Sequence, residues 1–411
     1  MKTLRRLPAL LLALLCLAGC GGGPKRLTEP AKAPRAEARP LAEEDAAALA
    51  EFSLGLLKEN WRGENALLSP LSALSALGMA ANGAGGETLA QMEAVLGLPV
   101  EKLNGTLAAW AAELPREKDC RVELANSVWV RDDGSFEADQ DFLETAAGWY
   151  QAEVFASPFD AAAVRDINRW VEKNTRGMIP EILRELREET MLVLVNALAL
   201  EAEWEEPYES HQVREGAFFH SEDRGKQNAD LMHSTEALYM KDGNAQGFMK
   251  PYKGGRWAFA ALLPDRGRLG DYLDSLTGER LHALLSEAEE REVYAAIPKF
   301  EKDYGAELAN SLKALGMTDA FDMERADLSG FGVSKLGPLF ISQVLHKTHI
   351  SVDEKGTKAG AATAVLADAG ADAPGMEEPV PRVYLDRPFL YMLVDRETNL
   401  PAFIGVVTAM E

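Results

Sequence analysis

The sequence contains few cysteines, few histidines and a deficit of positive charge. Two of its three cysteines, Cys16 and Cys20, lie near the start, so Cys120 has no partner for an internal disulfide in the body of the chain. The six histidines show no zinc-binding spacing such as HExxH, and we expect neither a metal site nor a cofactor. A formal net charge of −22 repels phosphates and argues against a nucleic-acid partner. Stability must come from packing, for which 47% hydrophobic residues suffice.

The apolar stretch near the start, residues 7–17, is too short to span a bilayer comfortably. It follows a basic segment, which is typical of a signal peptide. It ends in Leu17-Ala18-Gly19-Cys20, which resembles a bacterial lipobox, in which cleavage precedes the cysteine and the thiol receives diacylglycerol. The alternative is an ordinary signal peptide cleaved after Ala18. The lipobox predicts a signal peptide over 1–19 and a secreted protein anchored by Cys20 at the bacterial cell envelope, in the outer membrane or at the cell surface.

Two regions follow the predicted signal peptide. Residues 20–41 are rich in Gly, Pro, Ala and charge without apolar periodicity, which predicts a lipidated flexible tether. Residues 42–411 contain neither a second linker nor a repeat. We therefore expect one large domain that acts as a monomer.

Helical patterns dominate the first part of this domain and strands the later part, which indicates the α+β class. Ser69-Pro70 is typical of a helix start, and the pattern predicts a helix from there to Asn82-Gly83. A second helix is expected over 161–175. Strands are expected over 191–200, 256–264, 292–300, 388–394 and 400–407, the last two forming a hairpin.

A further strand is expected over 339–353, where a period of two places the even positions on a buried face. His346 then lies inside and needs hydrogen-bond partners. Asn196 is the only polar residue in the apolar run 191–200, and its side chain also needs hydrogen-bond partners. Pairing Asn196 with His346 would satisfy both side chains.

After this strand, small residues dominate from Gly356 to Val365, with Lys358 as the exception. Read as a strand, the segment has one face that is small and uncharged and could be buried, whereas Lys358 lies on the other face. The segment runs into a Gly-, Ala- and Asp-rich stretch typical of an exposed loop. A sequence suited both to a loop and to a buried strand indicates a conformational switch.

Here the chain resembles the serpin family. Glu354-Lys355-Gly356-Thr357, followed by small residues to Thr363, is similar to the hinge signature of that family and lies about thirty residues before Arg387-Pro388-Phe389-Leu390, with a loop longer than is usual in the family. The other segments that resemble the family, in the same order, are Ser69-Pro70-Leu71-Ser72, residues 125–130, residues 167–179, Val195-Asn196-Ala197 with Trp204, and residues 326–330.

The resemblance implies a serpin fold of about eight or nine helices around three β-sheets, with an exposed reactive-centre loop at about 354–382. It implies a protease inhibitor rather than an enzyme: a serine-type protease cleaves the loop, and the freed hinge inserts into the main sheet and traps the acyl-enzyme. The implied hinge residues are Glu354, Gly356, Thr357, Ala359, Ala361 and Thr363. The implied switch residues are Ser69, Asn196 and His346 beneath the opening sheet, Trp204 where the hinge enters, and Lys299 as the partner of Glu354.

The family spacing from Gly356 places the cleaved bond at Gly370–Ala371, and counting back from Pro388 gives Met376–Glu377 as the alternative. Small residues at the first site favour an elastase-like or subtilisin-like protease, and the absence of Arg and Lys between 359 and 381 argues against a trypsin-like one. The alternative function is a non-inhibitory serpin that acts as a surface binding or chaperone-like lipoprotein. The small hinge residues favour the inhibitor.

Overall fold

The computed structural model describes residues 23–28, 41–265, 268–357 and 379–410. Within these ranges it contains nine α-helices, and its strands form three sheets of seven, nine and two strands. The predicted α+β class, with eight or nine helices around three sheets, is confirmed.

The helices are mostly in the first half of the chain. Their bounds are α1 Glu43–Asn60, α2 Pro70–Ala81, α3 Gly86–Leu96, α4 Val100–Ala112, α5 Gln140–Tyr150, α6 Ala161–Asn174, α7 Leu269–Ser275, α8 Gly278–Ser286 and α9 Ala309–Ala314. Three short 3-10 turns are η1 Ser210–Gln212, η2 Asp319–Phe321 and η3 Ser329–Phe331.

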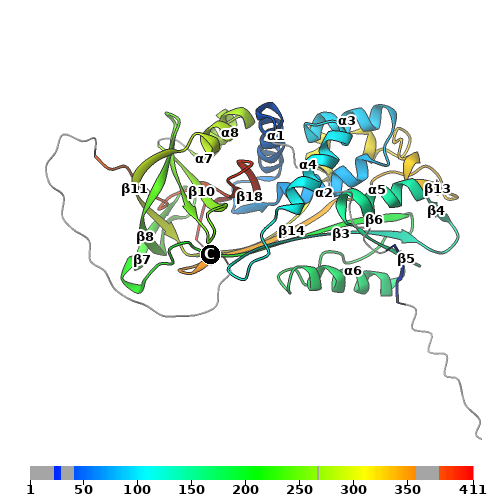
Figure 1. Ribbon diagram of the computed structural model, residues 1–411, viewed down its shortest axis with the longest axis horizontal. Coiled ribbons are helices and arrows are strands. Elements are labelled where there is room, and N and C mark those ends of the chain that lie inside the picture. The colour runs from blue at the N-terminus through cyan, green and yellow to red at the C-terminus, as the bar shows by residue number, and fades with distance from the viewer. Residues whose placement is uncertain (1–22, 29–40, 266–267, 358–378, 411) are drawn as a thin grey trace, which may run out of the picture.

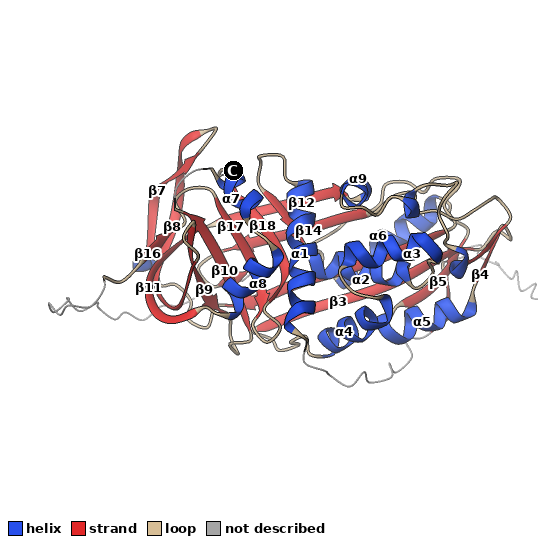
Figure 2. Cartoon of the chain, turned by 90° about the horizontal axis from the view of Figure 1, so that it is seen from above, coloured by secondary structure: helices blue, strands red, loops and turns tan. Residues whose placement is uncertain are grey.

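The seven-stranded sheet runs along the long axis of the molecule (Figure 1). In spatial order its strands are β1 Lys25–Thr28, β5 Glu153–Ser157, β3 Cys120–Arg131, β6 Leu192–Glu203, β15 Gly356–Thr357, β14 Leu345–Val352 and β12 Phe300–Glu307. Helices α2, α4 and α5 lie over one face and α6 covers the other (Figures 1 and 2).

The nine-stranded sheet lies at one end of the molecule (Figure 2). Its strands in order are β16 Arg382–Tyr384, β11 Glu289–Pro298, β8 Gly225–Lys241, β9 Ala245–Pro251, β10 Trp257–Pro264, β17 Phe389–Asp395, β18 Leu400–Val407 and β2 Ala66–Leu68, with β7 Val213–Ser221 paired to β8. The two-stranded sheet joins β13 Gly332–Ser334 to β4 Phe136–Ala138.

Each face of the seven-stranded sheet has its own hydrophobic cluster. The larger cluster includes Leu71, Leu74 and Leu77 of α2 and continues into the nine-stranded sheet. The smaller cluster packs Ile167 and Val171 of α6 against the other face. The sheet is therefore covered on both sides, which explains why β6 is an almost continuous apolar run.

The two predicted helices are present and begin at capping side chains. Ser69 accepts a hydrogen bond from the Ser72 amide at the start of α2, where Pro70 occupies the first turn. Asp160 accepts from the amides of Ala162 and Ala163 at the start of α6. The cap at Asp160 was not anticipated from the sequence.

The predicted strand 339–353 is wrong over its first part. Only β14, Leu345–Val352, is extended in the sheet, and its even positions are buried as expected. Residues 339–344 lack a neighbouring strand within the described residues, and their amides bond elsewhere: Ile341 donates to the Ala320 carbonyl and Val344 to Glu307. The alternation of apolar and polar residues over 339–353 predicted a buried face, but a strand also requires a neighbouring strand to which its backbone can hydrogen bond.

Two other boundaries differ from expectation. The predicted strand 292–300 is the end of β11 followed, after Lys299, by the start of β12. Residues 25–28 within the predicted tether form β1, which pairs antiparallel with β5 at the edge of the sheet. The hairpin of β17 and β18 is present, and Asn399 in its turn has a φ of 53°, which asparagine tolerates.

Candidate functional site

The central strands β6 and β14 are joined at only one end in the part of the chain that the structure describes. There β15 lies between them, and Thr357 pairs with Ala202 of β6 and with Val352 of β14. Past this rung β6 continues to Leu192, paired on its other side with β3. We call the space between β6 and β14 past β15 the slot. Its strand edges offer hydrogen-bonding groups to one further strand.

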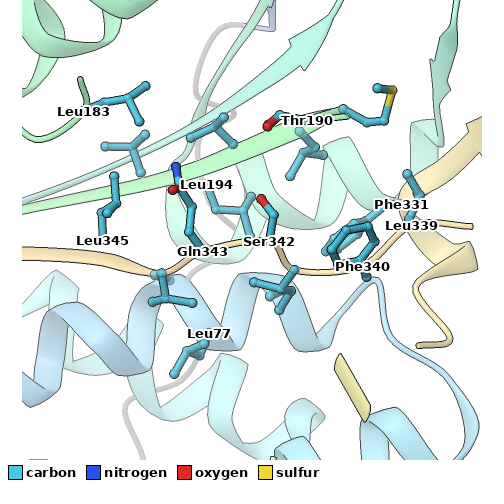
Figure 3. Close-up of a pocket in the computed structure, with 18 of the residues that line it drawn as sticks. Leu77, Leu183, Thr190, Leu194, Phe331, Leu339, Phe340, Ser342, Gln343 and Leu345 are labelled. Carbon is cyan, nitrogen blue, oxygen red and sulfur yellow. The ribbon is translucent and has the colours of Figure 1, made fainter. Parts of the chain in front are cut away.

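The slot is continuous with a mainly apolar cavity of about 180 Å³. Leu77 of α2, Leu194 of β6 and Leu345 of β14 line it, together with the segment 336–344 (Figure 3). Figure 3 shows Ser342 and Gln343 projecting from this segment toward β6. Because packed interiors leave few such voids, the cavity marks a region of the sheet that is incompletely filled.

A tight turn positions the hinge at the entrance of the slot. The Asp353 carboxylate accepts hydrogen bonds from the amides of Lys355 and Gly356, at 2.8 and 3.3 Å. A Cβ on Gly356 would lie 2.0 Å from the Ala202 carbonyl oxygen, so the close approach of β15 to β6 requires glycine. Thr357 follows as a buried residue of the same short strand.

Trp204 clamps this turn from the end of β6. Its amide donates to the Lys355 carbonyl at 2.8 Å and its indole Nε1–H to the Asp353 carbonyl at 2.9 Å. Its ring stacks on Tyr252 with a centroid distance of 4.6 Å, and the Tyr252 hydroxyl is hydrogen bonded to the Thr357 hydroxyl. The aromatic pair therefore holds both the backbone and the side chain of the hinge base.

Glu354 forms the expected ion pair with Lys299, which lies between β11 and β12. Partial burial acts to raise the pKa of the Glu354 carboxyl, but the hydrogen bond from Lys299, a backbone hydrogen bond and the charges of Lys299 and Lys355 together outweigh burial, and the pKa is lowered. The Glu354 carbonyl also accepts from the Tyr208 amide at 2.8 Å. Both partners are partly exposed, so the pair contributes little stability by itself and serves to orient the base of the loop.

A buried ionic cluster beside the hinge was not anticipated from the sequence. Lys250 lies 3.0 Å from the Glu236 carboxylate, and both side chains are buried. The Lys250 ammonium also lies 4.4 Å from the centroid of the Tyr208 ring. Desolvation raises the pKa of Glu236 despite its partner. The signal that could have revealed the cluster is a lone lysine at the end of the otherwise uncharged strand β9.

Ser69 and His346 meet beneath the sheet, as the resemblance implied. The Ser69 amide donates to His346 Nε2 at 3.0 Å, which assigns the imidazole proton to Nδ1. The Ser69 hydroxyl donates to the Ala402 carbonyl at 2.8 Å. Desolvation lowers the pKa of His346 to about 4, so the ring is neutral at physiological pH.

Asn196 does not pair with His346, contrary to expectation. Its amide donates to Asn126 Oδ1 of β3 at 2.7 Å, and Asn126 in turn donates to the Tyr150 carbonyl. The cross-strand neighbour on β3 is closer than a residue on the far side of the slot. The Asn196 Oδ1 atom has no hydrogen-bond partner among the described residues, although both Asn196 and His346 line the cavity. Asn196 thus keeps a free acceptor at the slot.

Several predicted site residues lie outside the described residues: Cys20, Ala359, Ala361, Thr363, Gly370, Ala371, Met376 and Glu377. The described ranges contain no group of three or more His, Cys, Asp or Glu residues placed to hold a metal ion. They also contain no helix long and apolar enough to cross a membrane.

A sheet with an open central slot, and a small-residue hinge at its entrance, define this chain as a serpin. The family profile described as "Serpin (serine protease inhibitor)" matches residues 47–410, and the chain belongs to that family. An uncharacterized serpin-like protein of Thermococcus kodakarensis is 32% identical over 87% of this chain and 84% of its own length. Alpha-1-antiproteinase of Rattus norvegicus is 29% identical over 97% of this chain and 96% of its own length.

Solved structures show the same fold. The thermophilic serpin tengpin in its native state has a TM-score of 0.86 and 41% identity, covering 94% of this chain and all of tengpin's. The latent state of tengpin gives a lower TM-score of 0.80 at 39% identity, covering 91% of this chain and 100% of that one. The described fold is thus more similar to the native than to the latent state.

Proposed function

We propose that this serpin inhibits serine-type proteases by trapping them after cleavage of its loop. The observation that carries the proposal is the slot, which is open between β6 and β14 and holds only Gly356 and Thr357 of the hinge among the described residues. The residues that follow Thr357 in the sequence are small as far as Val365, apart from Lys358. They fit a close-packed layer that would reject bulky or charged side chains.

The free energy for insertion comes from filling the slot. From Ala202 to Leu192 the edge of β6 is eleven residues long and spans about 33 Å. A strand inserted there pairs on both sides, and at ~1 kcal/mol for each hydrogen bond the gain is on the order of 10 kcal/mol. The inserted strand also covers the cavity and brings polar backbone close to the free acceptor of Asn196. The native state is therefore metastable.

The target class follows from the expected cleavage site. Gly370–Ala371 offers a small side chain to the specificity pocket, which suits elastase-like or subtilisin-like enzymes. Met376–Glu377 is the second candidate bond and would leave a longer segment before the cut. Residue Cys20 of the lipobox would carry the lipid that places the inhibitor at the bacterial cell envelope.

Incubation of the full chain with an elastase and a subtilisin tests the inhibitory function. We expect a covalent complex that survives boiling in detergent, and mass spectrometry of the released fragment will identify the cleaved bond. A non-inhibitory serpin would give only cleaved protein. Cleavage that leaves the melting temperature unchanged would contradict insertion itself.

A further inference from the structure

Strand β1 places the N-terminal segment at the end of the molecule opposite the hinge. Thr357 lies on the same rung as Ala202 and Cys120, whereas β5 pairs with β3 around Val128, eight residues farther along β3. This separation is about 26 Å. Strand β1 pairs with β5 there, and Figure 1 shows β5 at the end of the sheet that also carries β4 and β13.

Among the described residues, a short ladder and an ion pair join β1 to β5. Lys25, Arg26 and Thr28 pair with Ala156, Phe155 and Val154, with an irregularity before Thr28. Arg26 forms an ion pair with Glu153 at 2.9 Å, and both side chains are partly exposed. Such a pair contributes at most about 1 kcal/mol, and each strand hydrogen bond about the same. The pairing of β1 with β5 is therefore weaker than the free energy on the order of 10 kcal/mol proposed for insertion.

The short sequence distance between Cys20 and β1 limits how far the domain can lie from the bilayer. Lys25 is five Cα–Cα steps from Cys20, so the chain can place the lipidated residue at most about 18 Å from β1 while β1 is docked. When β1 is released, the 23 residues up to Glu43 extend this limit to about 80 Å. Docking of β1 therefore decides whether the domain is held close to the bilayer or far from it.

We propose that β1 is a detachable clasp that holds the β4–β13 end of the domain against the lipid bilayer, and that β1 must leave β5 when a protease is trapped on the membrane. This inference rests on the proposed lipid anchor and the proposed loop insertion. In the docked state the hinge end, with Trp204 and Thr357, faces away from the bilayer. The reactive loop is then presented to proteases in the surrounding medium.

Trapping moves the protease from the hinge end to the end of the domain that faces the bilayer. Insertion along the slot carries the acylated protease to the far end of β6, at Leu192, which lies about 10 Å across the sheet from β5. A protease domain of about 250 residues has a diameter of about 45 Å. It does not fit between that end of the sheet and a bilayer held within about 18 Å by the docked clasp.

The orientation is tested with the full lipidated chain on phospholipid vesicles that carry a headgroup acceptor fluorophore. The cysteine variants Val333→Cys on β13 and Phe218→Cys on β7 place a donor at opposite ends, since both side chains are exposed whereas Cys120 is buried. We expect stronger energy transfer from position 333 than from position 218. Equal transfer from the two positions overturns the proposed orientation.

Detachment is tested by locking β1 to β5 with the double variant Lys25→Cys/Ala156→Cys, whose Cα atoms face each other in the register. On vesicles the oxidised protein should lose most of its detergent-resistant complex and yield cleaved protein, and reduction of the disulfide should restore trapping. The same oxidised protein in detergent solution should trap normally. Equal trapping on vesicles and in detergent overturns the clasp.

If the proposed trapping or the proposed lipid anchor is wrong, the results differ from those that overturn the clasp. A wild-type chain that forms no complex even in detergent contradicts trapping, and a wild-type chain that does not bind vesicles contradicts the anchor. The reduced double variant is the matched control for the two substitutions. Loss of trapping in the oxidised form in both settings also overturns the clasp, because the effect would then not depend on the membrane.

Discussion

The backbone amide of Ser69 donates a hydrogen bond to Nε2 of His346, at 3.0 Å, and so joins the start of α2 to β14 at the edge of the slot. The imidazole accepts this bond only while it is neutral, because a protonated ring has no acceptor. Burial lowers the pKa of His346 to about 4. The contact beneath the sheet therefore depends on pH.

His346 should make the native state less stable in acid. Its folded pKa of about 4 lies below the ordinary 6.5, so the unfolded chain binds more protons between these values. The contribution is complete above pH 6.5 and decreases toward pH 4, by about 3 kcal/mol in all. Urea midpoints measured across this range should show the decrease, and His346→Gln should flatten it.

The matched control for this prediction is His349→Gln, on the other face of the same strand, where the histidine contacts Asp303. This variant keeps His346 and should retain most of the acid-dependent decrease. An unchanged pH profile in His346→Gln would contradict the assignment.

Gly356→Ala should displace β15 from its place between β6 and β14. The new Cβ would lie 2.0 Å from the Ala202 carbonyl, and overpacking of this kind costs about 1–3 kcal/mol. We expect faster hydrogen exchange at the Thr357 amide and a lower melting temperature. Gly305→Ala on β12 is the control, since its nearest neighbour is 3.6 Å away in the same sheet. Equal exchange in both variants would show that β15 tolerates a side chain.

Removal of one member of the buried pair Lys250–Glu236 should be more damaging than removal of both. Lys250→Met leaves the Glu236 carboxylate buried without its partner, which costs about 3–5 kcal/mol. The double variant Lys250→Met/Glu236→Leu should recover most of this loss, as measured by urea denaturation. Additive losses in the double variant would argue against a coupled pair.

The hinge should tolerate charge on only one face. Ala361 shares its strand parity with Thr357, which is buried, whereas Lys358 has the opposite parity and the register places it opposite the partly exposed Glu201. Ala361→Glu should convert an inhibitor into a substrate that is cleaved without forming a complex. Lys358→Glu should keep most of the trapping, as measured by moles of inhibitor consumed per mole of protease. Equal trapping by the two variants would contradict insertion in this register.

Local pattern was enough to predict what depends on strand period and turn chemistry. The alternation in β14 predicted the burial of His346, and the capping serine predicted the start of α2. The family resemblance predicted the contact of Ser69 with His346 and the Lys299–Glu354 pair.

Features that depend on which strands lie next to each other in the folded sheet could not be predicted from the sequence. Asn196 bonds to Asn126 because β3 is the strand paired with β6, and seventy residues of sequence separate the two side chains. Residues 339–344 have the alternation of a strand but face the slot rather than a partner. Strand β1 is only four residues long, and its pairing depends on the exposed edge of β5.

Cys120 occupies the rung of the sheet that also carries the hinge, through Ala202 to Thr357. It is a buried free cysteine, and burial raises the pKa of its thiol to about 11. A thiol in this state reacts slowly with alkylating reagents and oxidants. The rate at which Cys120 is modified therefore reports how often the strands separate at this rung. Mass spectrometry can measure that rate without any engineered probe.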